Sequence, residues 1–176
     1  MKLPARIFAL LFFALLLSAH STAQYHAGVG LRAGKFGSGL TMKYFLYPDN
    51  ATGFELMILK SKIAKGGWWV AAFYERQMPF DFPLIQLPLD FIVGAGAHVG
   101  YYPKNYYKIV EGFPDYYADN TIAVGVDLLI ALEYLVPLDW LPLAVGIEAQ
   151  PFLEFVNKGP EFIDFAITLK YVFRAD

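Results

Sequence analysis

Residues alternate between two faces along eight segments of the chain, and the ionisable side chains are unequally divided between these faces. One face of these segments carries eleven ionisable side chains: Arg32, Lys43, Glu55, Glu75, Asp90, His98, Asp127, Glu133, Glu148, Asp164 and Lys170. Such a set could form a proton or ion path. It could equally form a network of salt bridges and hydrogen bonds, which lowers the cost of burying polar groups together. We expect the second, a polar network that fills the inside of a barrel.

A wide aqueous channel does not fit the same face. It also carries large apolar side chains, namely Phe45, Met57, Trp69, Phe73 and Leu129. A barrel of eight strands has an interior only just wide enough for its side chains. The sequence therefore disfavours a porin.

His98 is the residue with the clearest catalytic potential. A histidine that activates a serine hydroxyl and is held by a carboxylate could perform acyl transfer or hydrolysis. Beyond residue 23 the chain has only His26 and His98, and only Ser38 and Ser61. No recognisable motif surrounds them, so we assign no catalytic residue.

The sequence also contains no motif for binding a cofactor. The chain contains no cysteine, which excludes disulfides and thiolate metal sites. We find no metal-ligand cluster, phosphate-binding loop or dinucleotide fingerprint, and we expect neither a metal nor a cofactor.

Two groups of residues could bind partners. The segment 102–120 is rich in tyrosine, a side chain that supplies contact area at low entropic cost. We expect it to be an extracellular loop, where a ligand could meet Tyr102, Tyr106, Tyr107, Tyr116 and Tyr117. Packing at a membrane interface is the alternative for these rings. The lysines at 35, 60, 62 and 65 could contact lipopolysaccharide phosphates.

The elements that must position these residues are strands. In residues 121–134 every even position is apolar, while the odd positions are small, acidic or, at Leu129, aliphatic. A period of two predicts a strand with different surroundings on its two sides. The same alternation predicts strands over 25–32, 40–46, 53–59, 68–75, 90–101, 143–150 and 163–173. The predicted connections on one side are 33–39, 60–67, 102–120 and 156–161, and those on the other side are 47–52, 77–89 and 135–142; the second set is periplasmic if the mature N-terminus starts in the periplasm. Three prolines in 78–88 argue against a central strand there.

Composition favours a membrane location. Hydrophobic residues make up 57% of the chain and aromatic residues 18%. Only helices and closed barrels satisfy every backbone group in lipid. No segment beyond residue 23 offers the roughly 20 apolar residues of a spanning helix, whereas a tilted strand needs only about 9–11. A barrel is therefore the leading candidate.

Two features place the apolar face outside. Glycines crowd the charged face, where they would make room for long side chains inside a small barrel. Aromatic residues also gather at both ends of the predicted strands, as amphipathic rings do at two membrane interfaces. They are Tyr44, Tyr74, Phe91, Tyr134, Tyr171 and Phe173 at one end, and Trp68, Tyr101, Phe155 and Phe162 at the other.

Residues 1–23 have the features of a secretory signal peptide. Lys2 and Arg6 precede an apolar run from Ile7 to Leu17, and small residues precede the predicted cleavage before Gln24. The predicted mature domain, 24–176, has 12 basic and 16 acidic residues, a net charge of −4. This balance gives no sign of nucleic-acid binding.

Together, the leader, the eight amphipathic segments and a last strand that alternates up to Phe173 resemble the small eight-stranded outer-membrane barrels of Gram-negative bacteria, the class of OmpX and the OmpA transmembrane domain. The resemblance implies an all-β, antiparallel, up-and-down, eight-stranded transmembrane β-barrel in the outer membrane. It implies contact with outer-membrane lipid and lipopolysaccharide, and with the barrel-assembly machinery during biogenesis. We therefore expect a structural, envelope-integrity or surface-binding role without catalysis.

Two alternatives stay open at this point. One is an outer-membrane enzyme that modifies lipid A and uses His98. The other is a periplasmic lipocalin-like barrel, which would turn its apolar face inward to bind an apolar ligand.

Overall fold

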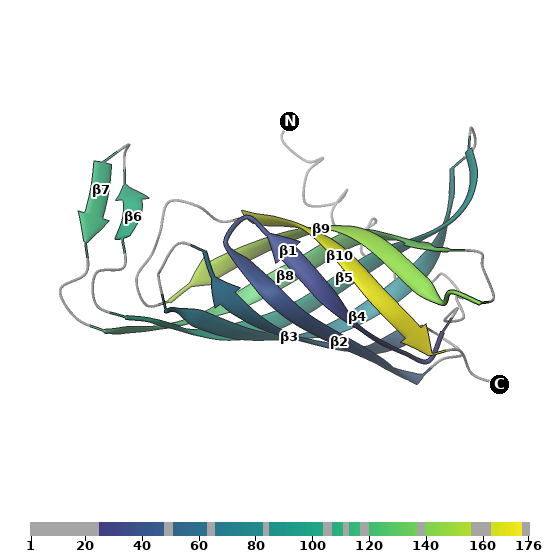
Figure 1. Cartoon of the computed structure of the whole chain (residues 1–176), viewed down its shortest axis with the longest axis horizontal. Helices are drawn as coiled ribbons and strands as arrows, with labels where there is room; N and C mark the ends of the chain where they lie inside the picture. Colours follow the sequence, from purple (N-terminus) through teal and green to yellow (C-terminus); the bar gives the residue numbers. More distant parts are fainter. Residues whose placement is uncertain are drawn as a thin grey trace, which may run out of the picture.

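Eight strands of this chain close into a barrel (Figure 1). The structure is a computed structural model, and it describes residues 25–47, 51–62, 66–82, 85–103, 107–110, 113–116, 120–136, 140–155 and 163–173. The predicted signal peptide, 1–23, lies outside the described residues. No helix in the described part of the chain is long and apolar enough to cross a membrane.

The barrel strands are β1 (Ala27–Gly34), β2 (Gly37–Tyr47), β3 (Thr52–Ser61), β4 (Trp68–Phe82), β5 (Ile85–Tyr102), β8 (Thr121–Leu135), β9 (Leu143–Glu154) and β10 (Ile163–Phe173). Each pairs antiparallel with its neighbours along the chain, and β1 pairs with β10 to close the sheet. The eight-stranded, up-and-down, all-β prediction is confirmed.

Alternation along each strand separates the two faces of the wall. In β10 every second residue from Ile163 to Phe173 is exposed, and the residues between them are buried. In β8 the even positions from Ile122 to Ile130 are exposed. Leu129, the residue that departed from the charged or small pattern of its face, is buried inside the barrel.

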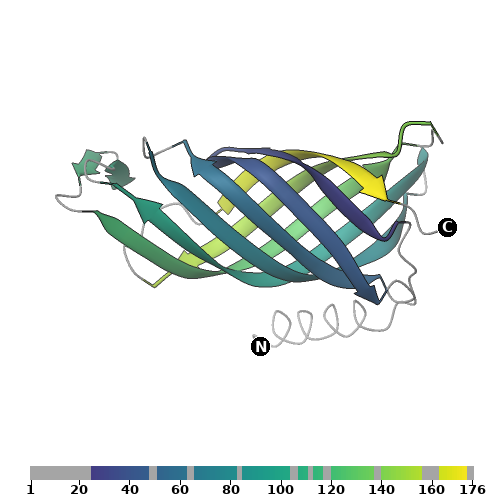
Figure 2. The ribbon, with the colours of Figure 1, turned by 60° about the horizontal axis from the view of Figure 1, so that its bottom comes forward.

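The predicted turn 77–89 is wrong in its extent. Strand β4 runs on to Phe82 and β5 begins at Ile85, so most of this segment forms a paired hairpin. The pairing of β4 with β3 ends at Arg76, and the pairing of β5 with β8 begins at Leu89. The hairpin therefore projects past the barrel, at the end where Phe173 lies (Figures 1 and 2). Prolines are tolerated there because each strand has an open edge.

The predicted long loop 102–120 contains structure that the alternation did not reveal. Two short strands, β6 (Tyr107–Val110) and β7 (Phe113–Tyr116), pair with each other as a separate sheet. They lie at the opposite end of the barrel from Phe173 (Figure 1). We call this end the β6–β7 end, and we call the other the terminal end because the described chain starts and finishes there.

Candidate functional site

The inside of the barrel holds all eleven ionisable residues that the alternation assigned to one face. Each is at most 5% exposed. Most of their side chains form two clusters along the barrel, and Asp90 accepts a 2.6 Å hydrogen bond from Gln77 Nε2.

The cluster nearer the terminal end is built around two lysines. Lys43 Nζ lies 2.9 Å from Glu75 Oε1 and 3.7 Å from Glu55 Oε2. Lys170 Nζ lies 2.9 Å from Glu55 Oε1 and 3.3 Å from Glu133 Oε2. Each lysine contacts at least two carboxylates, so neither charge is buried without compensation.

Two hydroxyl groups complete this cluster. Tyr25 Oη donates a 2.5 Å hydrogen bond to Glu133 Oε1, and Thr41 Oγ1 donates one to Glu55. Alternation had placed Tyr25 on the outward face. Tyr25 instead precedes β1, is 2% exposed and packs edge-on against Phe45. The strand period carries no information about a residue outside the strand, which is why sequence reasoning missed it.

The cluster nearer the β6–β7 end is built around Arg32. Its Nε and Nη1 atoms donate to Glu148 Oε2 at 3.0 Å and to Asp164 Oδ2 at 2.8 Å. Its Nη2 atom donates to Gln150 Oε1 at 3.0 Å. A planar guanidinium suits this arrangement, because its donors point in fixed and different directions.

Gln150 and Lys170 connect the clusters into one network. Gln150 Nε2 donates to Asp127 Oδ1 at 2.9 Å, and Asp127 Oδ2 lies 2.8 Å from His98 Nδ1. Lys170 Nζ lies 3.8 Å from Glu148 Oε1, which brings the two clusters together. Polar contacts therefore run through the barrel from Tyr25 to His98. Gln150 lay on the predicted inward face, but only the structure shows that it bridges Arg32 and Asp127.

Two glycines make room for these groups: Gly125, on the predicted inward face, and Gly34, which the sequence had placed in the connection 33–39 but which ends β1. A Cβ at Gly34 would lie 2.6 Å from both Arg32 Nη1 and Asp164 Oδ2. A Cβ at Gly125 would lie 2.5 Å from His98 Cε1. Side chains at these positions would displace the ion pair or the imidazole.

Apolar side chains share the described interior with these polar groups. Buried side chains of β3, β4, β5 and β8 form one cluster: Met57, Leu59, Trp69, Ala71, Phe73, Ile92, Leu129 and Ala131. These buried apolar side chains occupy part of the described interior in addition to the polar network. This arrangement agrees with the argument against a porin.

His98 has the carboxylate of Asp127 beside it, but Ser61 lies elsewhere on the barrel. Its ring packs edge-on against Trp69 and Phe152, and its Nε2 atom lies 3.8 Å from Glu154 Oε1. His98 pairs across the sheet with Ala71, whereas the Ser61 amide bonds to Gly67 O, four residues away along the chain. Four residues of a strand span about 13 Å. The structure thus does not bring Ser61 to His98. Among the described residues, no group of three or more candidate ligands could hold a metal ion.

The tyrosines proposed for ligand binding fall in different places. Tyr102 is the last residue of β5 and is 6% exposed, so its side chain offers little surface to a ligand. Tyr107 and Tyr116 are backbone partners across the β6–β7 hairpin. Tyr106 and Tyr117 lie outside the described residues. The proposal of an extracellular ligand remains a prediction.

The outside of the wall has the opposite character. Its exposed side chains are aliphatic and aromatic, and Leu31, Ile122, Phe165 and Ile167 are each about 60% exposed. Among the described residues of the barrel strands, only Lys60 and Arg76 carry charge on this outward face. The fold and site therefore define a small closed barrel that is charged inside and apolar outside, the architecture implied by the resemblance to small eight-stranded outer-membrane barrels.

Comparisons with known proteins add a structural likeness. The structure is similar to the crystal structure of Neisserial surface protein A (NspA), with a TM-score of 0.42 and 13% sequence identity. The match covers 82% of this chain and 91% of that chain. No protein-family model matches the sequence. The search of curated proteins gave no match either.

Proposed function

We propose that this chain is an integral β-barrel of the bacterial outer membrane, with a structural, envelope-integrity or surface-binding role and no catalysis. The observation that carries the proposal is the reversal of the two faces. Salt bridges fill the interior, while large apolar side chains cover the wall. Soluble proteins rarely expose so extensive an apolar surface, but a bilayer covers it without cost.

The dimensions and the closure of the sheet support this location. The barrel strands are 8 to 18 residues long. A tilted strand crosses the hydrocarbon core with about 9–11 residues. Pairing of β1 with β10 leaves no edge, so the backbone groups of the wall bond to neighbouring strands.

Exposed aromatic rings near the two ends of the barrel also support the proposed membrane location. Tyr44, Tyr171 and Phe173 lie toward the terminal end, whereas Trp68 and Phe155 lie toward the β6–β7 end. Amphipathic rings favour the two interfaces of a bilayer.

We further propose an orientation with the terminal end in the periplasm. The β6–β7 hairpin and the rest of segment 102–120 then face the outside of the cell, where they could meet a ligand. Outer-membrane lipid and lipopolysaccharide surround the wall, and the barrel-assembly machinery inserts the chain after export directed by residues 1–23.

The geometry around His98 favours a role without catalysis. Asp127 holds one side of the imidazole, but Ser61 is distant and two aromatic rings cover the histidine. Replacing His98 with alanine should therefore leave the cell's lipid A unchanged by mass spectrometry. A change in its acyl chains or head group would favour the enzymatic alternative.

The lipocalin-like alternative requires an apolar interior for its ligand. The structure puts the apolar face of the strands outside and eleven ionisable side chains inside. This arrangement argues against that alternative.

Fractionation and gel mobility test the proposal together. We expect the full-length protein in the outer-membrane fraction, extractable only with detergent. We also expect it to migrate differently in an unboiled sample than in a boiled one, because a closed barrel resists SDS until it is heated. A detergent-free monomer in the periplasm would overturn the proposal.

A further inference from the structure

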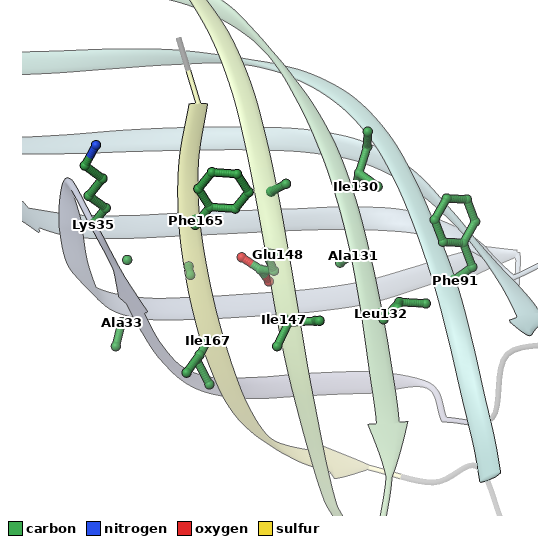
Figure 3. A pocket seen from close by; sticks show the side chains of 13 residues that line it. Ala33, Lys35, Phe91, Ile130, Ala131, Leu132, Ile147, Glu148, Phe165 and Ile167 are labelled. Atoms are coloured by element: carbon green, nitrogen blue, oxygen red, sulfur yellow. The ribbon is translucent and has the colours of Figure 1, made fainter. Parts of the chain in front are cut away.

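The outer wall carries a groove of about 620 Å³ that crosses several strands. Its lining includes Lys35, Phe91, Ile130, Ile147, Phe165 and Ile167. Figure 3 shows Lys35 at one end of the groove and Phe91 at the other. The lining between these residues is almost wholly apolar, so the groove suits a hydrocarbon chain.

The register of the strands explains the hollow. Ala149 on β9 pairs with Phe165 on one side and with Ile130 on the other. A small side chain between two large ones leaves a depression in the wall. Ile167, the next outward-facing residue of β10 after Phe165, pairs with Ala33 of β1. This second small side chain extends the depression toward β1.

The groove has an elongated shape. It reaches from β1 across β10, β9 and β8 to β5, which are successive neighbours in the barrel. Four spacings between strands correspond to about 19 Å. Because barrel strands are tilted, a path across them also descends along the wall, from Ala33 near the β6–β7 end toward Phe91 nearer the terminal end.

One cation, Lys35, lines the groove near the β6–β7 end, and a second, Lys62, bonds to the backbone of the lining residue Gly34. Lys35 is exposed in the turn between β1 and β2, with its Nζ atom 5.1 Å from the centroid of the Phe36 ring. Lys62 is exposed as well, and its Nζ atom donates a 2.8 Å hydrogen bond to Gly34 O in the same turn region. Positive side chains beside an apolar groove favour an anionic headgroup with its acyl chain below.

We infer that this groove holds an acyl chain of a lipopolysaccharide molecule, whose phosphate pairs with Lys35 and Lys62. The inference rests on the proposed outer-membrane location and orientation, which put the lysines at the level of the outer-leaflet headgroups. The barrel then retains one lipid at a defined place on its wall.

Lipid binding to the detergent-solubilised full barrel tests the inference. Native mass spectrometry would count bound molecules of purified rough lipopolysaccharide for the wild type, A149F and K35A. A149F fills the groove, and K35A removes a phosphate partner. Each should weaken binding about tenfold, the loss expected when a charged contact or a buried part of an acyl chain is removed.

Matched controls separate the groove from the rest of the wall. A72F places the same bulk at an exposed alanine of β4 outside the groove, and R76A removes a cation of β4 at the terminal end, away from Lys35. Both should bind lipopolysaccharide as the wild type does. Equal binding by A149F, K35A and the wild type would overturn the inference. Equally tight binding of phosphatidylglycerol would overturn its assignment to lipopolysaccharide.

Failure of the underlying proposal would look different. All variants should stay in the outer-membrane fraction and keep their mobility difference on heating, which shows that the barrels are folded. A wild-type protein that is soluble without detergent would contradict the membrane proposal itself, whatever lipid it binds.

Discussion

At the scale of single residues, the sequence predicts which side chains are inside but not which of them meet. Alternation identified Arg32, Lys43 and Lys170 as inward, since every second residue of a strand shares a face. It could not pair Arg32 with Asp164, because that contact depends on barrel closure between β1 and β10. The roles of Tyr25 and Thr41 were not predicted either: Tyr25 precedes β1, where the strand period does not apply, and the uncharged Thr41 hydroxyl gave no sign of an ionic network.

Lys43 tests the importance of the interior network for stability. Replacing it with methionine, which has a similar length, leaves Glu75 buried near the terminal end without its closest cation. Loss of one partner from a buried ion pair costs about 3–5 kcal/mol. We expect K43M to lower the free energy of unfolding by about that amount in urea titrations of the barrel in lipid vesicles.

The exposed Lys60, on the outward face of β3, provides the control for this substitution. K60M should change the free energy of unfolding by less than about 0.5 kcal/mol, as surface substitutions usually do. An equally small effect for K43M would contradict the view that the ion pairs hold the interior together.

At the scale of elements, alternation predicted all eight barrel strands but misjudged some of their ends. It stopped strand 143–150 before Pro151, whereas β9 continues to Glu154. The pairing of β8 with β9 is interrupted opposite Pro151, between the partners of Asp127 and Ile130. Proline cannot donate to a ladder, yet neighbouring pairs keep the register. The β4–β5 hairpin was missed for a related reason, since prolines on open edges weaken the local signal without preventing pairing.

The lipid-facing side of β8 gives a prediction that depends on depth. Leu128 lies at the middle of the strand and is 54% exposed, while Ile122 lies near its end and is 60% exposed. Arginine on the lipid face costs about 2–4 kcal/mol at the bilayer midplane and about 0–1 near an interface. L128R should therefore destabilise the barrel in vesicles by several-fold more than I122R does.

Equal effects of L128R and I122R would be inconsistent with a wall that spans the hydrocarbon core. Unfolding titrations of both variants in the same lipid would decide this point. The two substitutions add the same side chain to the same strand, so differences in propensity or size cancel.

Segment 102–120 is the element most separable from the barrel. The strands β6 and β7 pair with each other and form a sheet of their own. Deleting 104–118 should preserve the difference in mobility between unboiled and boiled samples, because this deletion leaves the hydrogen bonds between the eight barrel strands in place. If this segment binds an extracellular partner, the same deletion should abolish binding. A barrel that no longer folds would show that the segment has a structural role.

At the scale of the whole molecule, the account depends on which face of the strands meets the bilayer. The two-residue period identified two faces, but a period alone does not say which one is inside. Glycine crowding and aromatic placement supplied the choice, and the structure agrees: Arg32 and Lys170 are 1% exposed, while Leu31 and Ile167 are about 60% exposed. The division of the interior into polar and apolar parts could not be predicted, because it requires the spatial order of the strands.

Quenching of a fluorophore by brominated lipid tests most directly the claim that the apolar face of the strands meets the bilayer. The natural chain has no cysteine, so a single cysteine at Leu128 or at Trp140 can carry a fluorophore without competition. Leu128 lies in the middle of the wall, and Trp140 is 77% exposed in the turn between β8 and β9. In vesicles with brominated acyl chains, we predict strong quenching of the probe at 128 and weak quenching at 140. Quenching of the probe at 128 by aqueous iodide, with none by brominated lipid, would contradict the account.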